Sequence, residues 1–319
     1  MRIYIVGGSV RDRLLNIPPR DTDYLVVEAS DGDMLAKGLV KVGQTFPIFL
    51  NPENGDEYTL GKSVDEDLSR RDLTINAMAI DENNQLIDLY GGEDDLKKKI
   101  LRHVSRENFF EDPLRVLRVA RFMAQLPDFS IHPETLKLML EVVVTPAFAK
   151  ILPERMVKEL KRVFECEKPS QFFEVLKSVG AMSPHFQEIK SYENLDRMKG
   201  DEELSFSSIV TGMSLTDLEQ MTKRLNIQTN WIETAESWIL FSRLDLSHPE
   251  KVLDFFYEAD TFRKPRMIEH VVKLDPVRGK DLQRLYHLVK DIGIADVDPQ
   301  RKGKEIGEEI RRLRLKRLG

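Results

Sequence analysis

The fold is decided by residues 5–27, which are Ile5-Val-Gly-Gly-Ser-Val-Arg-Asp-Arg-Leu-Leu-Asn-Ile-Pro-Pro-Arg-Asp-Thr-Asp-Tyr-Leu-Val-Val27. A short apolar strand runs into Gly7 and Gly8, and a helical pattern follows at once. Backbone N–H groups of such a turn can approach an anion, because glycine has no side chain and a helix start favours negative charge. Arg11 lies about one turn into the helix and can reach the same anion. We therefore expect Gly8 and Arg11 to bind phosphate.

Two carboxylates stand in the second half of this stretch. Asp21 and Asp23 lead into the apolar run Tyr24–Val27. Because side chains alternate along a strand, both carboxylates point to one face. Two carboxylates so placed repel each other unless a cation lies between them, and Mg²⁺ typically takes one or two carboxylates together with substrate phosphates. The stretch thus predicts a triphosphate site that faces a metal site.

The composition limits the class of protein. Of 319 residues, 41% are hydrophobic and 32% are charged, which is typical of a globular protein with two or three domains. The net charge of −6 argues against non-specific coating of nucleic acid, although a local basic stripe can still bind RNA. Cys166 is the only cysteine, so we expect no disulfide framework, no cysteine-based zinc site and a cytoplasmic location. No apolar run is long enough to span a bilayer, and no stable protein partner is implied.

Two further stretches place polar residues beside apolar ones. Glu57 opens a strand expected over residues 56–60, which the turn 51–55 joins to a strand expected over 44–50. Residues 70–77, Arg-Arg-Asp-Leu-Thr-Ile-Asn-Ala, hold two arginines at the edge of an apolar run. An arginine in that position can bind phosphate or ribose oxygens in a bidentate manner.

Most of the remaining chain has a helical pattern. A helix is expected after Pro113, with Glu111 or Asp112 as its cap. Its arginines at 115, 118 and 121 recur at every third position along one side, which is also the pattern of an ordinary solvated face. Strands are expected over 2–6 and 23–28, and further helices over 34–42, 136–143, 153–160, 169–180, 215–225, 231–243 and 249–262.

Together these motifs resemble the signature of the nucleotidyltransferase superfamily. The order strand, Gly-Gly, helix with arginine, loop and Asp-x-Asp is similar to that of class II bacterial tRNA nucleotidyltransferases (CCA-adding enzymes) and bacterial poly(A) polymerases, whose pattern is GGxVRDxLLG…DxD. Asn16 replaces the last glycine of that pattern at a helix end, where asparagine tolerates the left-handed conformation. Residues 70–77 match the family's RRDxTINA motif, and residues 111–115 match its EDxxR motif.

The resemblance implies an α+β fold. An N-terminal nucleotidyltransferase head with a small mixed β-sheet and helices would cover residues 1–110, followed by an all-α neck with the nucleotide-selecting helix over 111–195 and an all-α body and tail that bind tRNA over 196–319. The implied activity is addition of C, C and A to the tRNA 3′ end from CTP and ATP, without a nucleic-acid template, with Mg²⁺ as cofactor and release of pyrophosphate.

The resemblance also implies roles for single residues. Asp21 and Asp23 would hold the metal ion, and Glu57 would be a third catalytic carboxylate. Asp112 and Arg115 would recognise the Watson–Crick edge of C or A, since mispaired buried groups would be left unsatisfied. The nucleotide-binding residues expected from the motifs and the resemblance together are Gly8, Arg11, Arg71, Asp112, Arg115, Arg118 and Arg121.

One departure from the family leaves the product open. Between the strand with Glu57 and the RRDxTINA motif the family inserts a flexible basic loop, whereas this chain goes almost directly from Lys62 to Arg70. Forms that add only CC are distinguished by a shortened loop, so a CC-adding enzyme remains an alternative. Two further alternatives are a poly(A) polymerase with the same motifs and a non-catalytic protein that binds the tRNA end.

Overall fold

The computed structural model describes residues 1–18, 22–42 and 48–319. It divides into two compact units, one formed by residues 1–152 with 174–181 and the other by 153–173 with 182–319. The division into head, neck and body at residues 110 and 195 remains a prediction, because compactness does not report the function of a segment. Among the helices of the described ranges, none combines the length and the apolar character that crossing a membrane requires.

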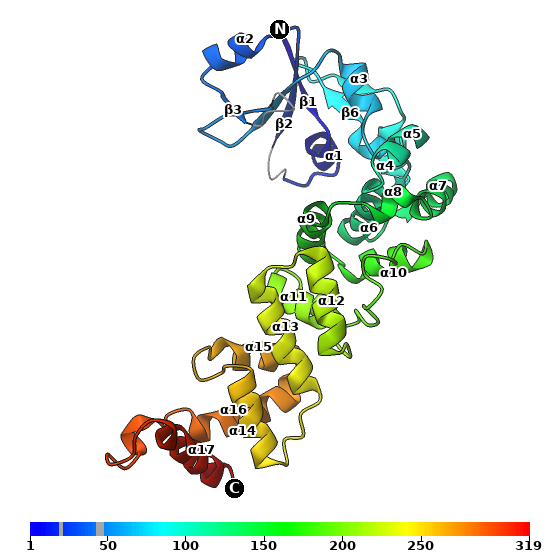
Figure 1. Cartoon of the computed structure of the whole chain (residues 1–319). Coiled ribbons are helices and arrows are strands. Elements are labelled where there is room, and N and C mark those ends of the chain that lie inside the picture. The colour runs from blue at the N-terminus through cyan, green and yellow to red at the C-terminus, as the bar shows by residue number, and fades with distance from the viewer. Residues whose placement is uncertain (19–21, 43–47) are drawn as a thin grey trace. The chain divides into compact units, whose positions relative to one another are not determined.

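A mixed β-sheet forms the centre of the first unit (Figure 1). Within the described residues its strands are β1 (Arg2–Val6), β2 (Asp23–Val27), β3 (Val40–Val42), β4 (Ile48–Leu50), β5 (Glu57–Leu60), β6 (Met78–Ile80) and β7 (Leu86–Asp88). They lie in the order β3-β4-β5-β2-β1-β6-β7. Strands β2 and β5 run parallel, and the other neighbours are antiparallel. This sheet, with its accompanying helices, confirms the predicted α+β fold.

The two faces of the sheet bury different helices, because side chains alternate along each strand. Leu25 and Val27 of β2 share a buried cluster with Leu68, which belongs to helix α3 (Val64–Ser69). Val26 points to the other face and shares a cluster with Met34 of helix α2 (Asp31–Ala36). The sheet is therefore covered on both sides, and the first residue of β2, Asp23, lies at the end of a buried strand.

The other elements of the first unit are mostly helical. They are α1 (Gly8–Leu14), η1 (Thr74–Asn76), α4 (Gly92–Lys97), β8 (Ile100–Leu101), α5 (Arg106–Glu111), α6 (Arg115–Gln125), β9 (Ser130–Ile131), α7 (Pro133–Val143) and α8 (Pro146–Ala149). Helix α6 carries the three arginines of the sequence pattern, and its apolar residues are almost completely buried. Helix α10 (Ser170–Ser178) contributes residues to both units.

The second unit is helical throughout its described residues. Its elements are α9 (Pro153–Phe164), η2 (Leu195–Met198), α11 (Glu202–Ile209), α12 (Leu215–Leu225), α13 (Thr229–Ser242), α14 (Pro249–Glu258), α15 (Arg266–Leu274), α16 (Pro276–Val289), η3 (Ile294–Asp296) and α17 (Lys304–Leu318). Trp231 is fully buried where three helices meet, with its ring centroid 5.4 Å from that of Phe164 and 5.3 Å from that of Phe206. The tail helix α17 is held by Arg314, whose guanidinium lies 3.5 Å from the Phe262 ring centroid and donates to the carbonyl of Ile292.

Several sequence predictions are confirmed. The strands over 2–6 and 23–28 are present, and the helix over 215–225 has the predicted bounds. Asn16 has a φ of 56°, the left-handed conformation expected of the residue that replaces glycine there. Part of the strand predicted over 44–50 lies outside the described residues, and the part over 48–50 is present as β4.

Two predictions are wrong. The helix predicted over 34–42 ends at Ala36, because Gly38 turns the chain with a φ of 80° and Val40–Val42 instead pair with β4. The predicted cap of the arginine helix is also wrong: the N-cap of α6 is Leu114, without a side-chain cap bond, and Glu111 ends the separate helix α5.

One glycine fixes how closely two helices of the second unit pack. A Cβ at Gly279, in α16, would lie 2.6 Å from the Cα atom of Val272 in α15. Backbone atoms cannot yield as the end of a flexible side chain can, so the two helices meet at this distance only with glycine present.

We expect Gly279→Ala to lower the free energy of unfolding by about 1–3 kcal/mol through overpacking. Gly307→Ala is the matched control, because Gly307 lies inside α17 with open space around its Cα, and alanine should gain up to about 1 kcal/mol there. Urea unfolding followed by circular dichroism measures both. An equal effect of the two substitutions would contradict the close packing at Gly279.

Candidate active site

The first residues of β2 and β5 lie side by side. Asp23 is aligned with Glu57 in the parallel register of the two strands. Aligned residues on neighbouring strands point to the same face of a sheet, so the two carboxylates share one face. Asp23 is partly buried and Glu57 is exposed. The structure therefore brings together two of the three carboxylates that the sequence predicts to be catalytic.

The donor chemistry of this strand end fits a hard divalent cation, which prefers carboxylate oxygens. Over residues 1–18, 22–42 and 48–319, no group of three or more His, Cys, Asp or Glu side chains is clustered so that it could hold a metal ion. Asp21, the other predicted metal ligand, lies outside the described residues. Its pairing with Asp23 therefore stays a prediction, and Asp23 and Glu57 are the described residues that fit one side of such a site.

Gly7 is the point at which three sequence motifs meet. It has a φ of 70°, and Gly8 begins helix α1 directly after it. A Cβ at Gly7 would lie 2.6 Å from Nη1 of Arg71 and 3.7 Å from Oδ2 of Asp23. The absence of a side chain thus lets the Arg71 guanidinium and the Asp23 carboxylate approach the same backbone turn. Ser9 adds a link, because its Oγ accepts a hydrogen bond of 3.1 Å from the Asp23 amide.

A second centre forms around Asp72, a residue that is only 4% exposed. Its Oδ2 accepts a hydrogen bond of 2.7 Å from Nε of Arg118. Its Oδ1 accepts bonds from Nδ2 of Asn76 at 3.0 Å and from the amide of Leu73 at 2.8 Å. Burial alone would raise the pKa of Asp72, but the charge of Arg118 and these hydrogen bonds outweigh it and hold the pKa well below its usual range.

Asn76 joins this centre to helix α1. Its Oδ1 accepts a hydrogen bond of 2.6 Å from Nη1 of Arg11, while its amide nitrogen donates to Asp72. Nε and Nη2 of Arg11 both donate to Oδ1 of Asp12, at 2.9 and 2.7 Å, and Arg11 is 5% exposed. Arg11 therefore links the glycine turn to the RRDxTINA motif in this structure. Its predicted contact with a phosphate stays a prediction.

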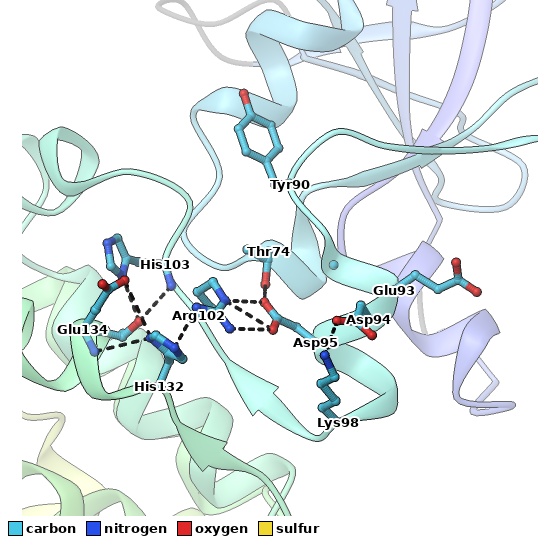
Figure 2. A network of polar contacts seen from close by, with 12 residues as sticks. Thr74, Tyr90, Glu93, Asp94, Asp95, Lys98, Arg102, His103, His132 and Glu134 are labelled. Atoms are coloured by element: carbon cyan, nitrogen blue, oxygen red, sulfur yellow. Dashed lines mark hydrogen bonds and ion pairs between the residues drawn. The ribbon is translucent and has the colours of Figure 1, made fainter.

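The η1 segment also carries Thr74, which belongs to a second polar network (Figure 2). The hydroxyl of Thr74 donates to the buried carboxylate of Asp95 at 2.7 Å, and Nε of Arg102 donates to the same oxygen at 2.9 Å. Nη1 of Arg102 lies 2.7 Å from Nε2 of His132, next to α7. These contacts tie η1, which carries Asn76, to α4 through Asp95 and to the start of α7 through Arg102 and His132.

One terminal nitrogen of the Arg115 guanidinium makes a hydrogen bond, and the other has no hydrogen-bond partner. Nη2 donates to the carbonyl of Arg70 at 2.7 Å, whereas Nη1 is buried and has no hydrogen-bond partner. Burial lowers the pKa of Arg115, and the carboxylates of Asp72 and Asp112 oppose that effect. A buried donor without a partner costs free energy, which a bound ligand with an acceptor in the right place would recover.

The other two arginines of α6 differ in their surroundings. The side chain of Arg118 is 31% exposed and pairs with Asp72. Arg121 is only 7% exposed, lies over the ring of Phe122 at 4.4 Å and donates to Oε1 of Gln125 at 3.1 Å. The pattern of every third residue therefore places Arg115 and Arg118 beside Asp72, while Arg121 is buried along the same helix. The nucleotide contacts of all three stay predictions.

Three residues of the site have a role that the sequence does not predict. Asp72 and Asn76 were recognised only as part of a motif, yet they form the buried junction between Arg11 and Arg118. The available signal was two polar residues inside the apolar run that follows Arg71. Asp67, which binds Arg71, gave no signal beyond its spacing of four residues.

Comparison with known families agrees with this architecture. Residues 49–102 match the family model described as poly A polymerase head domain. Residues 128–193 match the model described as probable RNA and SrmB-binding site of polymerase A. The two matches cover the segment with Glu57, Arg71 and Asp72, and the helices that follow α6.

Relatives and solved structures extend the match to the whole chain. The CCA-adding enzyme of Coxiella burnetii (strain RSA 331) is 32% identical over 360 aligned positions, which cover all of this chain and 95% of that protein. A solved structure of a CCA-adding enzyme with ATP has a TM-score of 0.75 at 22% identity and covers 99% of this chain and 86% of that one. The Thermotoga maritima CCA-adding enzyme complexed with tRNA has a TM-score of 0.69 at 24% identity, over 99% and 87% of the two chains. This chain belongs to the family of CCA-adding enzymes, which are nucleotidyltransferases.

Proposed function

We propose that this protein adds C, C and A to the 3′ end of tRNA, from CTP and ATP and without a nucleic-acid template, and releases pyrophosphate. Membership of the CCA-adding enzyme family along the full chain supports this activity. We also propose the cytoplasm as its location, since tRNA maturation is the implied task.

The observation that carries the proposal is the approach of Arg71 and Asp23 to Gly7. A guanidinium and a carboxylate that lie against one glycine turn suit a substrate with both phosphate groups and a bound cation. Glu57, aligned with Asp23, adds a carboxylate on the same face. Catalysis of nucleotidyl transfer is mostly positioning and charge stabilisation, so the site needs no nucleophilic side chain.

The residues that would hold Mg²⁺ are Asp21 and Asp23, with Glu57 as the third catalytic carboxylate. The chemistry supplied by the bound metal ion is a lowered pKa of the tRNA 3′-hydroxyl and stabilisation of the leaving pyrophosphate. Gly8 and Arg71 are proposed to bind the triphosphate and ribose. Arg11 is also proposed to bind the triphosphate. To do so its guanidinium must release the Asp12 carboxylate, which accepts hydrogen bonds from two of its nitrogens.

Base selection is assigned to Asp112 and Arg115, with contributions from Arg118 and Arg121. The buried Nη1 of Arg115 lacks an acceptor, and a cytosine or adenine edge would supply one. The pairing of Arg118 with Asp72 fixes the helix that carries Arg115. We place these functions at the junction of a head over 1–110 and a neck over 111–195, with tRNA bound by the helices of 196–319.

Transcripts of tRNA that end at the discriminator base, at C or at CC provide the test, with Mg²⁺ and labelled CTP and ATP. We expect all three to be extended to CCA, chelation of Mg²⁺ to stop the reaction, and Asp21→Ala with Asp23→Ala to abolish it. Asp94→Ala, which removes an exposed carboxylate of α4, is the control. Synthesis that stops at CC would make this a CC-adding enzyme, unlimited addition of A would make it a poly(A) polymerase, and tRNA binding without pyrophosphate release would make it non-catalytic.

A second prediction tests the convergence at Gly7. Gly7→Ala puts a methyl group 2.6 Å from Nη1 of Arg71 and forces a side chain into a left-handed backbone, so we expect the rate of CTP incorporation to fall more than about tenfold. Gly38→Ala introduces a comparable backbone strain, at a φ of 80°, with no atom beyond the two adjoining residues within 4 Å of the new methyl group. It should reduce thermal stability similarly and leave the rate unchanged. Equal loss of activity in both variants would contradict a special role of Gly7.

A further inference from the structure

We propose that Asp67 is a positioning residue that holds the guanidinium of Arg71 toward the Gly7 turn. The inference rests on the proposed function, in which Arg71 binds the incoming nucleotide, and it assigns a task to the short segment between Lys62 and Arg70. Asp67 acts through Arg71 and is not proposed to contact substrate.

The segment that carries Asp67 is an ordered helix. Ser63 caps α3 by accepting a hydrogen bond of 3.1 Å from the amide of Glu66. Leu68, at the far end of the helix, is fully buried in the cluster with Leu25 and Ala77. A cap at one end and a buried anchor at the other give Asp67 a fixed place relative to the sheet.

The backbone of Arg71 is fixed as well. Its amide donates to the carbonyl of Leu68 at 3.2 Å, and its own carbonyl accepts a bond of 3.1 Å from Nδ2 of Asn108 in α5. The guanidinium is therefore the part of Arg71 that is still able to move, and a second contact is needed to orient it.

Asp67 supplies that contact and fixes the orientation of the guanidinium, because it accepts from two of its nitrogens. Nε and Nη2 of Arg71 both donate to Oδ2 of Asp67, at 3.0 and 2.6 Å. This leaves Nη1 as the nitrogen that approaches Gly7. The side chains of the pair are only 14% and 27% exposed, so water competes weakly for the bond.

The neighbouring pair of Glu66 and Arg70 has the same spacing of four residues but makes a weaker contact. Their closest charged atoms are 3.8 Å apart, and their side chains are 38% and 54% exposed. Such surface pairs contribute little. Asp67 and Arg71 each lie one residue further along the chain, and the Arg71 guanidinium points toward the glycine turn.

The physical consequence is pre-organisation. A long arginine side chain that is already oriented loses less conformational entropy when it binds a phosphate. Asp67 also reduces the positive charge at the turn, so its removal would strengthen nucleotide binding if charge alone mattered. The two effects have opposite signs in the KM for CTP, which makes the proposal testable.

The experiment measures KM and kcat for CTP with a tRNA transcript that ends at the discriminator base. For Asp67→Ala we expect KM to rise about 3- to 10-fold, corresponding to one side chain that must be ordered on binding, with kcat changed by less than KM. Asp67→Asn keeps one acceptor oxygen and should restore part of the loss. Glu66→Ala is the matched control, with unchanged KM, and thermal melting of each variant checks the fold.

A double variant shows whether Asp67 acts through Arg71. Arg71→Ala should raise KM more than Asp67→Ala does, and adding Asp67→Ala to Arg71→Ala should have no further effect. An unchanged or lower KM for Asp67→Ala, or effects that multiply in the double variant, would overturn the positioning role and leave the role of Arg71 intact. A normal KM for Arg71→Ala would overturn both the nucleotide-binding role of Arg71 and the inference that rests on it.

Discussion

A buried carboxylate cannot stay ionised unless positive charge and hydrogen-bond donors surround it. Asp72 is such a group, and the donors that stabilise it come from separate parts of the first unit: Arg118 from α6, Asn76 from η1 and the amide of Leu73 next to it. Asn76 in turn accepts from Arg11 of α1. The requirement to satisfy one charge therefore fixes the position of the arginine helix relative to the helix that follows the glycine turn.

The same constraint extends to the other side chains of the candidate site. The sheet aligns Asp23 with Glu57 through strand register, and the missing side chain of Gly7 lets Arg71 and Asp23 both approach the glycine turn. The Asp72 centre then places Arg115, with its unpaired Nη1, on a helix that cannot shift independently of that turn. Nucleotidyl transfer depends on such positioning, because the reacting groups belong to the substrates and the metal ion.

The sequence predicts those parts of the fold and site that depend on local rules. The glycine turn, the strand of Asp23 and the left-handed Asn16 follow from residue type and spacing. The extent of burial does not: Arg11 and Arg121 have the same sequence signature as solvated arginines, and only tertiary packing shows that they are covered. Val40–Val42 become a strand because β4 offers a partner that no local pattern reveals. The role of Asp67 does not follow from the sequence, because it depends on the direction in which the Arg71 side chain points.

The role of Asp72 is tested most directly by titration calorimetry of CTP and UTP binding to the Asp72→Asn variant, beside the unaltered protein. Asparagine cannot neutralise Arg118, so the helix with Arg115 should lose its fixed position. We expect CTP affinity to fall about tenfold or more and the preference for CTP over UTP to shrink, while circular dichroism shows a folded protein. A folded Asp72→Asn variant with unchanged CTP affinity and unchanged preference would contradict the claim that this buried charge organises the site.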